Sequence, residues 1–303
     1  MPTLRIGTRR SALALAQAKE VAAGLRALGA ETELVAILTS GDRGAGASGS
    51  PAGRKGLFVA EIVRALQVGD VDLAVHSAKD LPSEDPDGVI VAAIPERANP
   101  FDVLVTREEA LADDGVVGTS SLRRQAQLRR VRPALRMRDV RGNVDTRLRA
   151  LGAGELEGLL LAAAGLGRLA IAPPHVVPMP VEEMVPAPGQ GALAVQTRDD
   201  PGSAAVDMVK QLDHGPSRRG FEDEREVVRR LGGGCALPLG AYAEAVSDGF
   251  RLLAVVIRPD GSDLVRAEAE GRTPEVAAAE VADALLAGGA AGILEDVRVA
   301  ADG

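Results

Sequence analysis

Aromatic side chains are nearly absent from this sequence, which has four Phe, one Tyr and no Trp among 303 residues. Hydrophobic residues still make up 46% of the chain, so its cores must be built from Leu, Val, Ile and Ala. Proteins that stack single-stranded nucleic acid bases on aromatic rings need more of them. Each aromatic residue that is present therefore deserves a specific explanation.

The chain has one cysteine, Cys235, so an internal disulfide is excluded, which fits a reducing compartment. The three histidines, His76, His175 and His214, are scattered, and no Cys or His pair has the spacing of metal ligands. No apolar run approaches the roughly 18 residues of a membrane span. The apolar run at residues 12–16 is too short for a signal peptide. We therefore expect a cytoplasmic protein without a metal ion and without a membrane partner.

Charge is distributed unevenly along the chain. The formal net charge is −8, yet residues 119–149 contain ten Arg and two Asp, which gives +8. A basic block within an acidic protein indicates a local anion site, whereas a nucleic-acid binder is more often basic overall. An RNA-binding protein that uses this block is a competing hypothesis. The acidic remainder and the scarcity of aromatic residues argue against it, so we expect no nucleic-acid partner.

Short apolar runs alternate with helical patterns through most of the chain. The alternation predicts strands at residues 4–7, 31–38, 73–76, 89–94, 103–105, 116–118, 134–137 and 159–162, and helices at 11–28, 57–68, 121–130 and 144–151. Ser11 is expected to cap the first helix, and Gly29 to end it. Such a βαβ rhythm predicts an α/β fold of open sheets with helices on both faces.

Two segments interrupt this rhythm. Residues 41–56 have almost no apolar side chains, and we expect a long mobile loop there. Residues 173–188 contain six prolines, which is typical of a linker between domains. After about residue 214 the pattern changes to a helix at 217–231, three strands at 239–245, 250–257 and 264–270, and a helix at 274–287. Consecutive strands favour a small antiparallel sheet in a separate α+β domain.

Two strand-to-helix junctions in the basic block are candidate anion sites. They are GTSSLRR at residues 118–124 and VRGNVDTR at residues 140–147. A helix N-terminus offers free N–H groups, and arginine binds carboxylates through two parallel hydrogen bonds. Either junction alone is equally well a surface helix with solvated arginines. Two of them at the ligand-binding edge of one sheet favour a small molecule with several carboxylates.

Two further motifs are candidates for chemistry. HSAKDLP at residues 76–82 follows an apolar strand, and its Asp80 can stabilise a cation or transfer a proton. A simple ion pair within the loop is the alternative. GGGCALP at residues 232–238 places the only thiol in a permissive loop. A lone cysteine is usually a small buried hydrophobe, but at the tip of a glycine-rich loop it is a better candidate for a covalent role.

Taken together, these segments resemble the porphobilinogen deaminase (hydroxymethylbilane synthase) family. The matching stretches occur in the family's order and are RIGTRRSALALAQA from Arg5, residues 56–59, HSAKDLP, GTSSLRRQAQ from Gly118, RGNVDTRL from Arg141, AAAGLGRL from Ala162, PGQGA from Pro188 and LGGGCALPLG from Leu231. The resemblance implies two domains like type II periplasmic binding proteins, with a cleft between them, and a small C-terminal α+β domain with an antiparallel sheet. The three domains would take residues 1–95 with 190–212, 96–189, and 213–303.

The resemblance also implies an activity and a set of residues for it. Members of this family are transferases that join four porphobilinogen molecules head to tail into hydroxymethylbilane, releasing ammonia at each step of this tetrapyrrole and haem biosynthesis reaction. A dipyrromethane cofactor would be bound through a thioether to Cys235, and Asp80 would be catalytic. Cofactor binding would also use Lys79, Asp80, Thr119, Ser120, Ser121, Arg123, Arg124 and Arg147. Substrate binding would use Arg9, Ser11, Gln17, Lys55, Phe58, Arg141, Arg147, Arg168 and Gln190.

Some residues and alternatives stay open at this stage. Family members are typically monomers, so we expect a monomer. Six arginines of the basic block match no site, and we expect several of them to be solvated: Arg129, Arg130, Arg132, Arg136, Arg138 and Arg149. The alternative function is a non-catalytic, two-lobed protein that binds a polycarboxylate.

Overall fold

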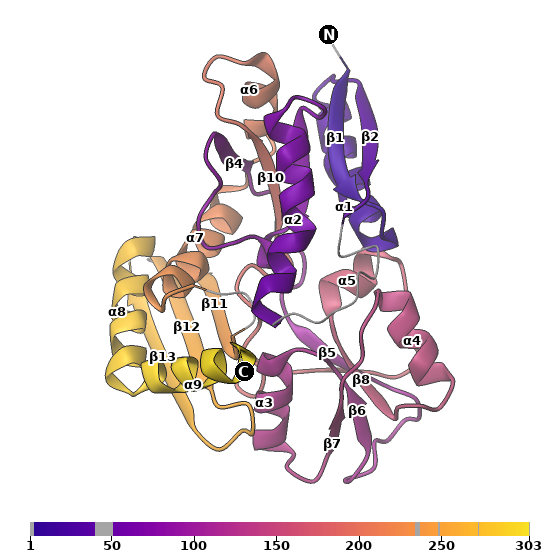
Figure 1. Cartoon of the computed structure of the whole chain (residues 1–303), viewed down its shortest axis with the longest axis vertical. Coiled ribbons are helices and arrows are strands. Elements are labelled where there is room, and N and C mark those ends of the chain that lie inside the picture. Colours follow the sequence, from indigo (N-terminus) through magenta and orange to yellow (C-terminus); the bar gives the residue numbers. More distant parts are fainter. Residues whose placement is uncertain (1–2, 40–50, 234–236, 248, 272, 303) are drawn as a thin grey trace.

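The chain forms three β-sheets with helices packed against them (Figure 1). The computed structural model describes residues 3–39, 51–233, 237–247, 249–271 and 273–302, without the side chains of residues 51–58, 274, 301 and 302. We call the first sheet and its helices lobe 1, the second sheet and its helices lobe 2, and the third sheet and its helices the C-terminal unit. Figure 1 shows lobe 1 at the top, lobe 2 at the lower right and the C-terminal unit at the lower left.

Lobe 1 is a five-stranded sheet in the order β2-β1-β3-β10-β4. Its strands are β1 (Leu4–Arg9), β2 (Thr32–Ile37), β3 (Leu73–Ser77), β4 (Val89–Ala93) and β10 (Leu193–Arg198). Its helices are α1 (Ala12–Ala27), α2 (Pro51–Gln67) and α6 (Ala204–Lys210). Leu73 and Val75 pack with α1, whereas Ala74 between them packs with α2. Because successive residues of a strand point to opposite faces, α1 and α2 cover opposite sides of the sheet.

Lobe 2 repeats this arrangement with the order β7-β6-β8-β5-β9. Its strands are β5 (Asp102–Thr106), β6 (Val116–Gly118), β7 (Arg136–Arg138), β8 (Gly158–Ala162) and β9 (Val176–Pro178). Its helices are α3 (Leu122–Val131), α4 (Val144–Gly152) and α5 (Ala163–Arg168). Leu128 of α3 packs in one hydrophobic cluster, and Leu151 and Leu166 of α4 and α5 pack in another, so this sheet is also covered on both faces.

In each lobe, the first strand after the chain crosses over from the other lobe is antiparallel to its neighbours in the sheet. In lobe 1 this strand is β10, which is antiparallel to β3 and β4, and in lobe 2 it is β5, which is antiparallel to β8 and β9. The chain crosses between the lobes twice, through residues 94–101 and 179–192. These two crossings join two similar lobes, so the predicted two-lobed α/β fold is confirmed.

The C-terminal unit is the predicted small antiparallel sheet, β11 (Leu239–Val246), β12 (Gly249–Ile257) and β13 (Leu264–Gly271). Helices α7 (Gly215–Arg230), α8 (Pro274–Ala287) and α9 (Ala290–Asp302) pack on one face of it, in one hydrophobic cluster. Among the described residues no single helix is long and apolar enough to span a membrane. The helices Glu275–Ala287 and Ala290–Ala300 reach the required length and apolar composition only when they are counted together, and the pair is bent by 76°.

Two arginines without a predicted site hold this unit against lobe 2. Arg129 Nη1 donates to the carbonyl of Pro259 at 2.6 Å, and Arg130 Nη1 donates to the carbonyl of Ser262 at 3.1 Å. The acceptors lie in the turn between β12 and β13. The expected solvated face is present, since Arg130, Arg132, Arg136, Arg138 and Arg149 are exposed, whereas Arg129 is half-buried.

The structure corrects two predictions about connecting segments. Residues 51–56 are not part of a loop but the first turns of α2, while residues 40–50 lie outside the described residues. Proline is favoured in the first turn of a helix, and packing of the later turns on the sheet stabilises the whole helix despite its glycines. The proline-rich segment contains β9, so only its second half connects the lobes.

The predicted strands and helices otherwise have their counterparts, with the strand expected at 134–137 lying at Arg136–Arg138. Among the described residues, five strands and α-helices were not predicted, namely β9, β10, α5, α6 and α9. The strands of lobe 1 come from residues 4–93 and 193–198, those of lobe 2 from 102–178, and those of the C-terminal unit from 239–271. The boundaries of the domains themselves stay a prediction.

Candidate active site in the cleft between the lobes

A cavity of about 350 Å³ lies between lobes 1 and 2. Its walls come from the carboxyl ends of β1 and β3, from α1, and from the loops and helices that follow β7 and β8. Five cationic side chains and two carboxylates line it, together with polar groups: Arg9, Lys79, Arg124, Arg147, Arg168, Asp80, Asp145, Ser11, Gln17, His76, Ser77 and Asn143. The cavity therefore has an excess of positive charge.

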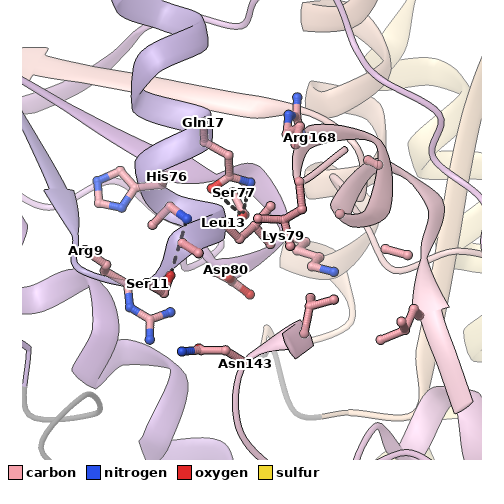
Figure 2. A pocket seen from close by; sticks show the side chains of 18 of the residues that line it. Arg9, Ser11, Leu13, Gln17, His76, Ser77, Lys79, Asp80, Asn143 and Arg168 are labelled. Atoms are coloured by element: carbon pink, nitrogen blue, oxygen red, sulfur yellow. Dashed lines mark hydrogen bonds between the residues drawn. The ribbon is translucent and has the colours of Figure 1, made fainter. Parts of the chain in front are cut away.

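The HSAKDLP motif carries the central carboxylate. Strand β3 ends at Ser77, and one 3₁₀ turn, Ala78–Asp80, then directs Asp80 into the cavity. Figure 2 shows Asp80 pointing into the space between Arg9, Lys79 and Asn143. Gln17 Nε2 of α1 donates to Ser77 Oγ at 2.8 Å, which fixes the end of the strand against the helix.

His76 lies beside this carboxylate but is only 6% exposed. Burial lowers the pKa of His76 to about 4, although the charge of Asp80 acts in the opposite direction. The imidazole is therefore neutral at neutral pH. Its Nε2 atom has no hydrogen-bond partner within the described part of the chain. His76 adds no positive charge to the cavity, so the cations that remain are lysine and arginine.

A buried aspartate that was not predicted, Asp102, positions two of the predicted arginines. Arg123 Nη1 donates to Asp102 Oδ2 at 2.7 Å, and Arg124 Nε donates to Asp102 Oδ1 at 2.9 Å. Gln190 Nε2 donates to the same Oδ1 atom at 3.0 Å. Burial alone raises the pKa of Asp102, but the charges of Arg123 and Arg124 and these hydrogen bonds outweigh it and hold the pKa well below its usual range. One carboxylate thus serves two guanidinium groups, and a net positive charge remains.

The guanidinium of Arg147 is a further positive charge in the cavity. Its Nε donates to the carbonyl of Gly142 at 2.8 Å, and Gly142 has a φ of +100°, which favours glycine. Burial lowers the pKa of Arg147, and the charge of Arg124 lowers it further. No carboxylate forms an ion pair with Arg147 among the described residues. A half-buried guanidinium beside another guanidinium is an arrangement that an anionic ligand stabilises.

Ser11 and Arg168 line the cavity from opposite lobes. Ser11 caps α1 as predicted, since its Oγ accepts from the amide of Ala14 at 3.3 Å. Arg168 ends α5 and donates through Nε to Glu20 Oε2 of α1 at 2.8 Å. This ion pair joins the two lobes, because α1 belongs to lobe 1 and α5 to lobe 2.

Six predicted residues do not line this cavity. Ser121 and Arg123 line a smaller cavity of about 80 Å³ beneath it, next to the C-terminal unit. Thr119 is fully buried, and Ser120 Oγ donates to the carbonyl of Val140 at 2.5 Å. Gln190 lies below the cavity, where its Oε1 accepts from Lys79 Nζ at 3.3 Å. Arg141 is exposed. Their roles in binding stay predictions.

Three further predicted residues cannot be placed. Cys235 lies outside the described residues, as do the side chains of Lys55 and Phe58. The described elements on either side of this residue are α7, which ends at Arg230, and β11, which begins at Leu239. Glu224 of α7 is fully buried and accepts from Arg97 Nη1 at 2.7 Å and from the amide of Gly189 at 2.6 Å. It therefore ties the C-terminal unit to both crossings between the lobes.

Asp102 and Glu224 escaped the sequence analysis for the same reason. Each is an acidic residue without a motif around it, and its basic partner lies far away in the sequence, 21 residues for Asp102 and Arg123, and 127 for Glu224 and Arg97. The only local signal at Asp102 is a charge at the start of a strand that is buried throughout.

The fold and the cavity together define a two-lobed α/β protein whose cleft is built for an anionic ligand around one central carboxylate. The sequence matches the family model "Porphobilinogen deaminase, dipyromethane cofactor binding domain" over residues 4–205, and "Porphobilinogen deaminase, C-terminal domain" over residues 221–287. The chain belongs to the porphobilinogen deaminase family, whose members are transferases of tetrapyrrole biosynthesis.

Curated relatives agree over nearly the whole length. The chain is 45% identical to the porphobilinogen deaminase of Rubrobacter xylanophilus over 300 residues, which cover 97% of each sequence. It is also 45% identical to that of Thermus thermophilus over 282 residues, which cover 91% of this chain and 92% of the relative. Among solved structures, the methionine binding protein MetQ matches 74% of this chain and 91% of its own, with a TM-score of 0.44 and 12% identity.

Proposed function

We propose that this protein condenses four porphobilinogen molecules and one water into hydroxymethylbilane, with release of one ammonia for each porphobilinogen added. The observation that carries the proposal is the composition of the cavity, where Asp80 is surrounded by five cations from both lobes. Each porphobilinogen has two carboxylates, so the growing chain becomes more anionic at every step. Hydrogen bonds between arginine and carboxylate are among the strongest available to hold it.

The cavity suits the dipyrromethane that the family model names. A dipyrromethane made from two substrate units has several carboxylates, and Lys79 of lobe 1 with Arg124 and Arg147 of lobe 2 would hold them. Burial and then the charge of Arg124 lower the pKa of Arg147, and a bound anion would stabilise its charged form. When bound, the cofactor supplies the free pyrrole carbon to which new units are added. Its covalent attachment to Cys235 is part of this proposal.

Asp80 would act on the reacting centre. The amino group of the porphobilinogen aminomethyl substituent leaves as ammonia, its methylene carbon stays on the pyrrole, and the positive charge left on the substrate needs a nearby anion. Asp80 can accept a hydrogen bond from the pyrrole N–H and stabilise that charge. The new carbon–carbon bond displaces a proton from the pyrrole carbon of the chain. The Asp80 carboxylate can take this proton and pass it to the departing ammonia, so that each step releases one ammonium ion.

Turnover and intact mass test the proposal together. Purified protein incubated with porphobilinogen should release one ammonia per substrate consumed, and mass spectrometry should show species that are heavier by successive pyrrole units. The resting protein should be heavier than its sequence by one dipyrromethane, and C235S should lack this mass. Absence of ammonia release by protein that has the cofactor mass would refute the proposed activity.

The alternative function, a binder of polycarboxylates without catalysis, predicts saturable binding of porphobilinogen without loss of ammonia. We also propose that the protein is a cytoplasmic monomer. The single cysteine fits a reducing compartment, and the monomeric state is what the family resemblance implies. Light scattering coupled to gel filtration should give a mass near 31.2 kDa.

A further inference from the structure

Arg168 is a cation of the cavity that is paired with a carboxylate outside the cavity lining, Glu20. Its guanidinium donates from Nε to Glu20 Oε2 at 2.8 Å and from Nη2 to Glu20 Oε1 at 3.4 Å, so both carboxylate oxygens are engaged. The Arg168 side chain is 8% exposed, whereas that of Glu20 is 44% exposed. The arginine is thus held within the cleft by a carboxylate that remains in contact with solvent.

This ion pair spans the two lobes. Glu20 lies on α1 of lobe 1, and Arg168 ends α5 of lobe 2. Gln17, one helical turn before Glu20, lines the same cavity. Figure 2 shows Arg168 on the wall of the cavity that faces Gln17 and Lys79. Glu20 itself is not one of the residues that line the cavity. It therefore reaches Arg168 from the rim, while an anion in the cavity would reach it from inside.

An anionic substrate and Glu20 must compete for the same guanidinium. A carboxylate that approaches Arg168 meets an ion pair with no net charge, and it gains the full attraction only when Glu20 releases the arginine. Glu20 loses little on release because its carboxylate is already half in water. Release of the pair would also remove one link between the lobes.

We propose that Glu20 is a positioning residue that holds Arg168 as a latch across the cleft and is displaced by a substrate carboxylate. This inference rests on the proposed function, because it takes porphobilinogen as the ligand of Arg168. Glu20 sets the affinity for the substrate without touching it. The chemical step at Asp80 is not affected.

The variant E20Q tests the latch, because glutamine keeps an oxygen that can accept from Arg168 but removes the competing charge. We expect the KM for porphobilinogen to fall about threefold to fivefold, the range that a partly exposed ion pair supports, with kcat within about twofold of the wild type. In the R168Q background, E20Q should leave KM unchanged, since the latch has no arginine to hold. A structural role alone would not split KM from kcat in this way.

The matched control is E109Q, which removes one negative charge from an exposed position of lobe 2 away from the cavity. E109Q should have the KM of the wild type, which separates the latch from a general change in charge. A KM for E20Q that equals or exceeds that of the wild type overturns the proposal, as does the same fall in KM in the R168Q background. Wild-type protein that releases no ammonia would instead refute the proposed function and is recognised before any variant is compared.

Discussion

The substitution Asp102→Asn is the sharpest test of how the cleft is held together. It keeps the size of the side chain but removes the charge that lies between Arg123 and Arg124, all three of which are buried. Removal of one partner from a buried ion pair typically costs about 3–5 kcal/mol, because the remaining charge is left uncompensated. Here two guanidinium groups are left, so the upper part of this range is expected.

The loss should be visible as a lower melting temperature and a weaker hold on the ligand. For a chain of this size the expected fall in Tm is on the order of 10 °C, since each kcal/mol shifts Tm by roughly 2–4 °C. Differential scanning calorimetry of D102N and wild type measures this, and intact mass measures how much cofactor D102N retains. The control D113N removes a charge from an exposed position of the same lobe and should unfold like the wild type.

The pH dependence adds an independent check. Because the pKa of Asp102 is lowered in the folded state, its contribution to stability is complete above its unfolded pKa, near 4, and is lost as the pH falls below that value. The difference in Tm between wild type and D102N should therefore be constant from pH 5 to 8 and should narrow below pH 4. A D102N protein that melts within about 1 °C of wild type at pH 7 would refute the assignment of Asp102 as the residue that holds both arginines.

Three other predictions follow from the site and the C-terminal unit. The variant D80N should keep the mass of the cofactor but lose at least about 100-fold in turnover, measured as ammonia release; near-normal turnover would remove Asp80 from the chemistry. R147Q should raise the KM for porphobilinogen about tenfold or more without loss of Tm, since the guanidinium contributes a charge-assisted hydrogen bond to the ligand and has no carboxylate partner among the described residues. Asp223 is fully buried, and burial, followed by the charges of Glu224, Glu275 and Glu222, raises its pKa to about 7, so its stabilising effect is lost as the pH rises from about 4 to 7. D223N should therefore melt a few degrees above wild type at pH 8 and lose this advantage near pH 4, whereas D283N, at an exposed position of α8 that is not among these charges, should not.

Local sequence patterns predicted local structure well. The strand Val116–Gly118, the cap of α1 at Ser11 and the extent of α8 were found as expected, because each depends on apolar periodicity and turn chemistry within a few residues. The missed strand β10 has buried polar residues, Gln196 and Thr197, which hide it from a search for alternation. Its place in the sheet comes from pairing with β3 and β4, more than 100 residues away.

The sequence likewise predicted one part of the candidate site, and the fold decided the other. The motifs identified Asp80, Lys79, Arg124 and Arg147, and all four line the cavity. Residues at the carboxyl ends of neighbouring strands meet at one edge of a sheet, which is why local motifs could find them. The motifs did not separate Arg123 from Arg124, although the two are adjacent in the sequence. Only the packing of α3 directs Arg124 to the large cavity and Arg123 to the smaller one.

The sequence by itself determined the chemistry of this protein: an acid among many arginines, a single thiol, and motifs shared with one family over most of the chain. The tertiary structure decided which of those charges face a ligand and which face each other. Asp102 neutralises part of the basic block from 21 residues away, and Glu20 holds Arg168 across 148 residues. The physical reason is that electrostatic interactions depend on distance and burial in space, which composition and local spacing do not contain.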